Sequence, residues 1–232
     1  MIPLLLRQES IYEDATPENR AVLSQVAVDE KASSSVSAAS SLVLVGYESY
    51  STGTSTIRTP KNSSVTVYKM AAVEVLMDTS TGGYYYGNTL SDFPSSYKTT
   101  LNNETEEVYG ISPIADPTVK YNCHSYAWYQ QSTSNPYWLN YPDKFITDGS
   151  YTKVSKLEVE IGGRMVYYDT IFDTYGTPTH SAIITGIVDR VHSVREFTVK
   201  SKWGMLGLYE HSWINCPYYY VNLTPVDLEY YN

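Results

Sequence analysis

The chain has 232 residues, of which 42% are hydrophobic and 18% charged, so it is long enough to fold around a sizeable core. Its 25 acidic and 16 basic residues give a formal net charge of −9, and the basic residues form no cluster along the chain. Nucleic acids and anionic membrane surfaces bind clustered positive charge, so this composition excludes both as partners.

Composition also indicates where the protein works. The chain contains 24 tyrosines and is rich in serine and threonine, which favours an extracellular or cell-wall-associated protein. The N-terminal stretch MIPLLLRQES lacks the basic region and the longer apolar region of a secretory signal, so no signal peptide is predicted. No stretch approaches the roughly 18 apolar residues that cross a bilayer, and we expect no membrane insertion.

Residues 1–41 are expected to form a short helix followed by a linker. Thr16 is a suitable N-cap, and Pro17 suits the first helical turn. The serine-rich stretch ASSSVSAASS that follows has too little apolar bulk to pack against a core. These features place a boundary near residue 41.

Residues 42–106 are interpreted as a β-rich extension whose role the sequence does not indicate. The runs LVLVGYESY, SVTVYKMAAVEVLM and GGYYYG are separated by turn-forming residues and predict strands. Periodicity leaves the stretch from Val65 to Met77 open between strand and helix. The polar, proline-containing stretch from Ser91 to Asp116 is predicted to wrap the surface.

Residues 107–232 predict a helix followed by a sheet. The helix begins at Cys123 and extends to about residue 132, before Asn135 and Pro136 end it. The runs GGRMVYY, SAIITGIVDR and EFTVKSKWG then predict strands, the last two as an antiparallel hairpin around residues 191–193. The fold class expected is α+β.

Cys123 and His180 are the candidate catalytic residues. A thiol at the start of a helix is biased towards thiolate, and an imidazole at the mouth of a strand can accept its proton. Each residue alone is as easily structural, because a lone cysteine is commonly a core thiol. Together they favour a nucleophile and its base, whereas Cys216 is expected to be packed in the core.

A metal site is not expected. The two cysteines and four histidines show no CxxC or HxxxH spacing, which closely spaced zinc ligands would require. We predict no metal, no cofactor and two free thiols.

Three segments in this order, VYGISPIADPTVKYNCHSYAW, GGRMVYY and THSAIITGI, resemble the papain-like cysteine peptidase and amidase superfamily. The similarity lies with its NlpC-type and CHAP-type branches, which include bacterial cell-wall hydrolases, and it covers residues 107–220. It implies a papain-like catalytic domain over residues 107–232, with the nucleophile helix packed on an antiparallel sheet. It also implies that Cys123 and His180 cleave an amide bond in a peptide or peptidoglycan stem peptide.

The residue that orients the imidazole is less clearly indicated. The predicted hairpin places His180 opposite the stretch from Ser201 to Met205, and Ser201 is the hydrogen-bond acceptor in that stretch. We therefore predict Ser201 as the third catalytic residue, with His211 and Asn215 as alternatives.

Four residues are predicted to contact substrate. Tyr109 is suggested by the resemblance and Tyr121 by its closeness to Cys123, while His124 and Trp203 are expected to face the cleft. Two other functions stay open: an inactive cell-wall or glycan-binding module on the same fold, and a toxin-like deamidase or acyltransferase with the same nucleophile.

Overall fold

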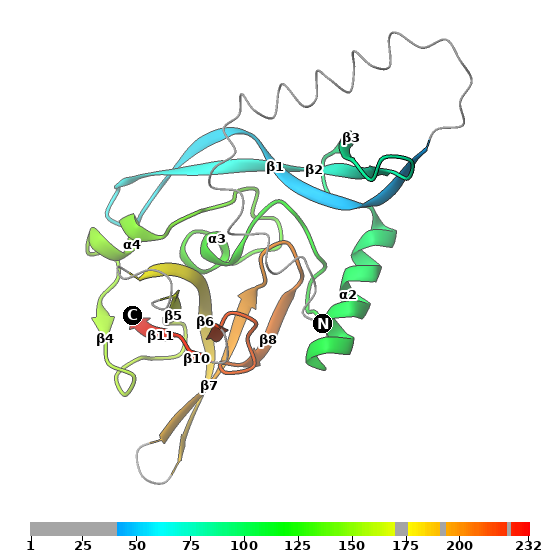
Figure 1. Cartoon of the computed structure of the whole chain (residues 1–232). Coiled ribbons are helices and arrows are strands. Elements are labelled where there is room, and N and C mark those ends of the chain that lie inside the picture. Colours follow the sequence, from blue (N-terminus) through cyan, green and yellow to red (C-terminus); the bar gives the residue numbers. More distant parts are fainter. Residues whose placement is uncertain (1–40, 170–175, 191–193, 222–223) are drawn as a thin grey trace. The chain divides into compact units, whose positions relative to one another are not determined.

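The computed structural model describes residues 41–169, 176–190, 194–221 and 224–232, which form a mixed α+β structure (Figure 1). The helix and most of the linker expected in residues 1–41 lie outside the described residues. The described residues divide into two compact units, one with residues 41–50 and 71–93, the other with residues 51–70 and those from 94 onward. The boundaries expected at residues 41 and 106 stay a prediction.

A three-stranded sheet has the order β1-β2-β3. Its strands are β1 (Leu42–Arg58), β2 (Ser64–Asp78) and β3 (Tyr84–Leu90). β2 and β3 are antiparallel, with a register shift between Val73 and Val75. The strand interpretation of residues 65–77 is therefore confirmed over the helical one.

Residues 91–116 lie mostly at the surface, as expected, but they contain a helix that the sequence did not predict, α2 (Ser95–Tyr109). Its sequence SSYKTTLNNETEEVY carries few apolar residues, and only Leu101 and Thr105 are buried, so there is little helical periodicity to recognise. Gly110 ends the helix in the left-handed conformation at φ 67°, where its N–H reaches the Glu106 carbonyl.

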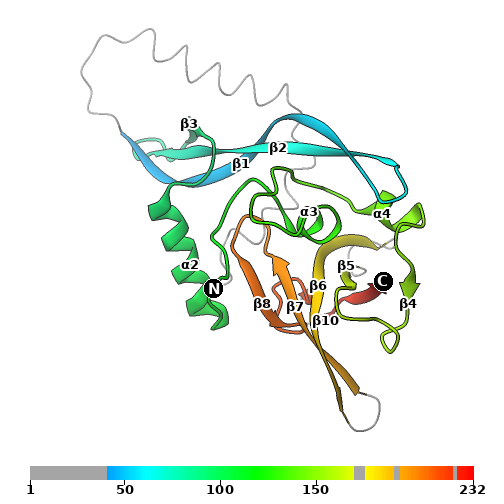
Figure 2. The same ribbon diagram turned by 180° about the vertical axis from the view of Figure 1, so that it is seen from behind.

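The second unit contains a six-stranded antiparallel sheet of order β4-β11-β5-β6-β7-β8 (Figure 2). Its strands are β4 (Lys153–Val154), β5 (Arg164–Asp169), β6 (Thr177–Arg190), β7 (Val194–Lys202), β8 (Leu208–Ser212) and β11 (Asp227–Tyr231). A separate pair is formed by β9 (Tyr220–Val221) and β10 (Thr224–Pro225). The β6–β7 pairing confirms the predicted antiparallel hairpin.

Two short helices accompany this sheet, α3 (Cys123–Trp128) and α4 (Asp143–Thr147). α3 ends earlier than expected, because the N–H groups of Tyr129 and Gln130 both bond the Ser125 carbonyl. The buried Asn135 amide then donates to the Ser125 and Gln130 carbonyls, which gives these two acceptors a partner where the chain leaves the helix.

Each face of the six-stranded sheet has its own hydrophobic core. On one face Tyr126, Ala127 and Trp128 of α3 pack with Val166 and Ile183. The other face holds a second cluster, formed by Met165, Tyr167, Ala182, Ile184, Phe197, Val199, Cys216, Val226, Tyr230 and Val159. Because successive side chains of a strand point to opposite faces, this division determines where each candidate residue lies.

Candidate active site around Cys123 and His180

Asn122 anchors the start of α3. Its side-chain oxygen accepts from the Ser125 N–H at 3.0 Å and from the Leu139 N–H at 3.2 Å, and its amide donates to the Leu139 carbonyl at 2.7 Å. Asparagine at this position satisfies a helix-end donor that would otherwise be orphaned. Cys123, the next residue, is thereby held at the first position of the helix, where it is 3% exposed.

His124 and Trp128 attach α3 to β6 through one hydroxyl group. The Trp128 indole N–H donates to Ser181 Oγ at 2.9 Å, and His124 Nδ1 lies 2.8 Å from the same oxygen. Since Ser181 accepts from Trp128, its own hydroxyl hydrogen can go to His124 Nδ1. Burial lowers the pKa of His124 to about 4, partly offset by a hydrogen bond to the backbone of Pro178, so its ring is neutral at pH 7.

His180 is adjacent to Ser181 and lies on the opposite face of the sheet. Its cross-strand partner is Tyr167, which belongs to the core on the face away from α3. The His180 ring stacks on Tyr218 with centroids 4.3 Å apart and planes 6° apart, and it meets the edge of Tyr167 at 5.3 Å. In this conformation the structure does not bring the imidazole to Cys123, because strand alternation directs Ser181, rather than His180, at the helix.

The His180 side chain is 0% exposed, and neither ring nitrogen has a hydrogen-bond partner among the described residues. Burial is the main cause that holds the pKa of His180 well below the usual histidine value, and the nearby His124 and His211 lower this pKa further. The ring is therefore neutral at physiological pH. Buried polar atoms are rarely left unsatisfied, since each such atom costs roughly 1–3 kcal/mol.

Ser201 lies on the same face as His180 but bonds a different histidine. Its Oγ is 2.9 Å from His211 Nε2, and the Trp203 indole N–H reaches both atoms, at 3.1 and 3.2 Å. His211 Nδ1 lies 2.8 Å from the Ser212 carbonyl, so Nδ1 carries the proton and Nε2 accepts. His211 is held in the core by this network, whereas Asn215, the other alternative, is exposed.

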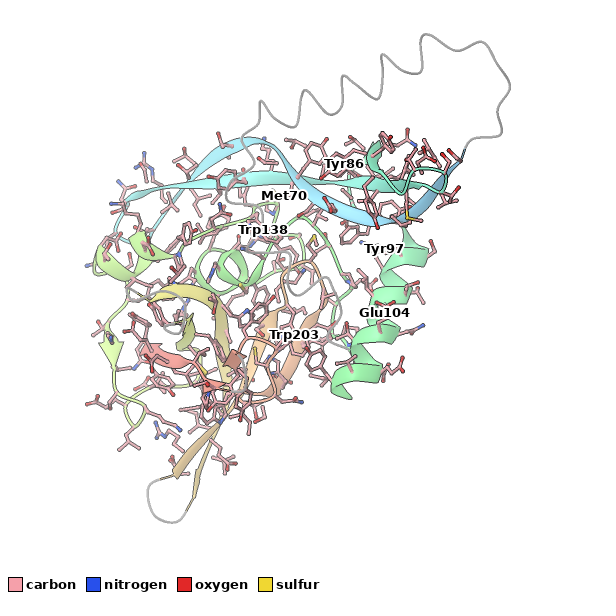
Figure 3. All side chains as sticks on the ribbon, viewed as in Figure 1. Met70, Tyr86, Tyr97, Glu104, Trp138 and Trp203 are labelled. Carbon is pink, nitrogen blue, oxygen red and sulfur yellow. The ribbon has the colours of Figure 1, made fainter. Side chains whose placement is uncertain are left out.

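The predicted substrate contacts are largely internal. Trp203, labelled in Figure 3, is fully buried and packs against the rings of Tyr209 at 4.3 Å and Tyr109 at 5.0 Å. Tyr121 is also buried and stacks on Tyr126 of α3 at 6.2 Å. Tyr109 is half-buried, so among these aromatic residues it alone keeps part of its surface open.

Lys202 is a residue whose importance the sequence does not reveal. It is 0% exposed, and its ammonium donates to the backbone carbonyls of Thr118, Gly204 and Leu206. Its Nζ also lies 5.3 Å from the centre of the Tyr121 ring. A strand pattern of EFTVKSK predicts at most that Lys200 and Lys202 share a face, because nothing in it distinguishes a buried lysine from an exposed one.

Both cysteines are free thiols. Cys216 lies in the core on the His180 face, and burial raises its pKa to about 12. It is therefore protonated at neutral pH and unsuited to act as a nucleophile. This placement confirms the packed thiol expected from the sequence.

No family model matches the chain, and neither the curated proteins nor the solved structures contain a match. Within the described residues, no helix is long and apolar enough to cross a membrane. The same residues contain no group of three or more histidine, cysteine or acidic side chains that could hold a metal ion.

Proposed function

We propose that the protein is a cysteine hydrolase that cleaves an amide bond, with Cys123 as nucleophile and His180 as general base. The helix that begins at Cys123 is bonded to Ser181, and the adjacent residue on the same strand is His180. The thiol and the imidazole thus belong to two elements that are joined directly.

The observation that carries the proposal is the state of the His180 ring. It is neutral, buried and without a partner for either nitrogen among the described residues. A histidine kept only for packing would be expected to find hydrogen bonds, as His124 and His211 do. An imidazole with an available nitrogen is what a base requires.

The proposal requires the His180 ring to turn towards α3. The start of β6 offers a place for such a change, since the register shifts here: Tyr167 pairs with His180 and Tyr168 with Pro178, which leaves Thr179 as an extra residue. β-Bulges of this kind redirect side chains and are frequent beside active sites. A shift of the bulge by one residue would pair Thr179 with Tyr167 and leave His180 as the extra residue, able to turn towards the other face.

The reaction would then follow the usual course for a thiol nucleophile. His180 takes the Cys123 proton, the sulfur bonds the amide carbonyl carbon, and the Cys123 backbone N–H with one further donor holds the oxyanion. Breaking the C–N bond transfers the proton from His180 to the leaving amine. Water then hydrolyses the thioester and restores the thiol. The resemblance to cell-wall hydrolases points to peptidoglycan stem peptides as the substrate.

Release of new amino groups from purified muropeptides tests this function. We expect release by the wild type and by Cys216→Ala, and none by Cys123→Ala. Cys216→Ala is the matched control because it removes a thiol from the same unit without touching α3. Equal release by Cys123→Ala would overturn the proposal, and release of ammonia without chain cleavage would favour the deamidase.

A binding module is the second candidate, and one observation favours it. The imidazole and α3 lie on opposite faces of the sheet, as expected for a Cys–His pair that no longer reacts. Exposed rings such as Tyr84 and Tyr86, which are 68% and 37% exposed on β3, could stack on sugars. Retention of wild type and Cys123→Ala on insoluble peptidoglycan, with no hydrolysis by either, would support this function.

A further inference from the structure

Lys202 is the only lysine or arginine that the described part of the chain buries completely. It is the last residue of β7, and it shares a face with Lys200, whose cross-strand partner is Ile183 of the core beside α3. The Lys202 ammonium therefore lies on the α3 side of the sheet. His180, Ser201 and Cys216 lie on the other side.

Three backbone carbonyls surround this ammonium. Its Nζ lies 3.2 Å from the Thr118 oxygen and 2.6 Å from the Gly204 oxygen, with the Leu206 oxygen as the third acceptor. An ammonium group has three N–H donors, so all three are used. Two of the carbonyls come from the turn between β7 and β8, and the third comes from the segment that leads into α3.

The ammonium is also in contact with the residues that precede the nucleophile. The Tyr121 ring faces Nζ at 5.3 Å, a distance at which a ring face attracts a cation. Tyr121 in turn stacks on Tyr126 within α3. One lysine thus fixes Thr118 and Tyr121, which lie five and two positions before Cys123 in the sequence.

Burying a charge is costly, and an apolar side chain of similar length would fill the same volume more cheaply. The charge itself therefore calls for an explanation. α3 has only six residues, and its histidine neighbour His124 is neutral, so neither supplies a strong positive field for a thiolate. Lys202 is placed to supply one.

We propose that Lys202 is a positioning residue that holds the segment before Cys123 and lowers the pKa of the Cys123 thiol by its positive charge. This inference rests on the proposed function of Cys123. The ammonium faces Tyr121, two residues before the nucleophile. At an effective dielectric of about 20, a positive charge about 10 Å from a thiol would favour its ionised form by roughly one pKa unit. The charge therefore increases the fraction of thiolate at neutral pH.

The test is titration of Cys123 by the ultraviolet absorbance of its thiolate, with every protein carrying Cys216→Ala. Lys202→Met removes the charge while keeping the length of the side chain, and Lys200→Met removes a charge from the same strand and face. We expect Lys202→Met to raise the Cys123 pKa by about 0.5–1 unit and Lys200→Met to leave it unchanged. In muropeptide hydrolysis at pH 7, Lys202→Met should lower kcat about 3- to 10-fold with little change in KM.

Circular dichroism must show that Lys202→Met is folded. If it is not, Lys202→Gln takes its place, because the amide keeps two N–H donors for the carbonyls without the charge. An equal Cys123 pKa in wild type and in the folded uncharged variant would overturn the role of Lys202 alone. A wild-type Cys123 pKa near the ordinary value of about 8.5 would instead remove support from the proposed hydrolase.

Discussion

Ser181 and His180 are neighbours on β6, yet their side chains serve opposite faces of the sheet. The Ser181 hydroxyl accepts a hydrogen bond from the Trp128 indole N–H and contacts His124, while His180 stacks on Tyr218. One residue therefore holds the helix of the candidate nucleophile, and the other is the candidate base. A change of one residue in register at this point would alter which of the two faces α3.

Ser181→Ala should destabilise the fold strongly. The substitution leaves the buried Trp128 N–H without its acceptor and removes the partner of His124 Nδ1. Each buried unsatisfied group costs about 1–3 kcal/mol, so we expect the free energy of unfolding to fall by about 2–4 kcal/mol in urea denaturation. The exposed Ser134→Ala is the control and should change it by less than about 0.5 kcal/mol. A loss below about 1 kcal/mol for Ser181→Ala would contradict the shared hydrogen-bond role.

His180→Phe should separate stability from activity. The phenyl ring keeps the stack between Tyr218 and Tyr167 and removes two buried nitrogens that have no partner among the described residues. We expect the free energy of unfolding to stay equal or to rise by about 1–2 kcal/mol, whereas hydrolysis should be lost. The two quantities are measured by urea denaturation and by amine release from muropeptides. A variant that is clearly less stable would show that the His180 nitrogens are satisfied in the native protein.

Cys216 should be inert until the protein unfolds. Burial raises its pKa to about 12, so almost no thiolate forms at pH 8. Mass spectrometry after brief iodoacetamide treatment of Cys123→Ala should find Cys216 unmodified, with full modification in urea. Rapid modification of the folded variant would show that this thiol is reachable and ionised.

Acid should unfold the protein through its buried histidines. Burial lowers the pKa of His124 and His211 to about 4, while the unfolded chain takes up protons near 6.5, so the unfolded state binds more protons between these values. The stability they contribute is complete above about pH 6.5 and is lost as the pH falls towards 4. Each histidine contributes a slope of at most about 1.4 kcal/mol per pH unit in that window.

Urea denaturation at several pH values between 7.5 and 4.5 measures this slope. His211→Gln should lower the slope by the share of one proton, because the variant lacks one of the groups that take up a proton on unfolding. An unchanged slope in this variant would assign the acid sensitivity to other groups.

Several parts of the fold follow from local sequence patterns. Alternating apolar residues and turn signals correctly predicted the β6–β7 hairpin, whereas periodicity left residues 65–77, which form most of β2, open between strand and helix. α2 was missed because its buried face consists of Leu101 and Thr105, which leave almost no apolar period in the sequence.

The candidate site depends on a detail that sequence patterns do not carry. A strand beginning THSAII can present either His180 or Ser181 to the helix, and the pairing of Tyr167 with His180 and of Val166 with Ser181 decides between them. Likewise, the strand pattern does not distinguish a solvent-exposed Lys202 from the buried one in the structure. Its burial depends on the Thr118, Gly204 and Leu206 carbonyls that accept its hydrogen bonds. The first outcome depends on the pairing of β6 with β5, and the second on Thr118, 84 positions from Lys202 in the sequence, together with the adjoining turn.

The parallel stack of His180 on Tyr218 also makes the orientation of the His180 ring measurable by spectroscopy. A proton held above the face of an aromatic ring experiences its ring current, so the imidazole C–H resonances of His180 should be displaced upfield. If the ring left Tyr218 to approach Cys123, this displacement would vanish. Nuclear magnetic resonance with isotope-labelled histidine could therefore follow the orientation of the ring directly, with and without substrate.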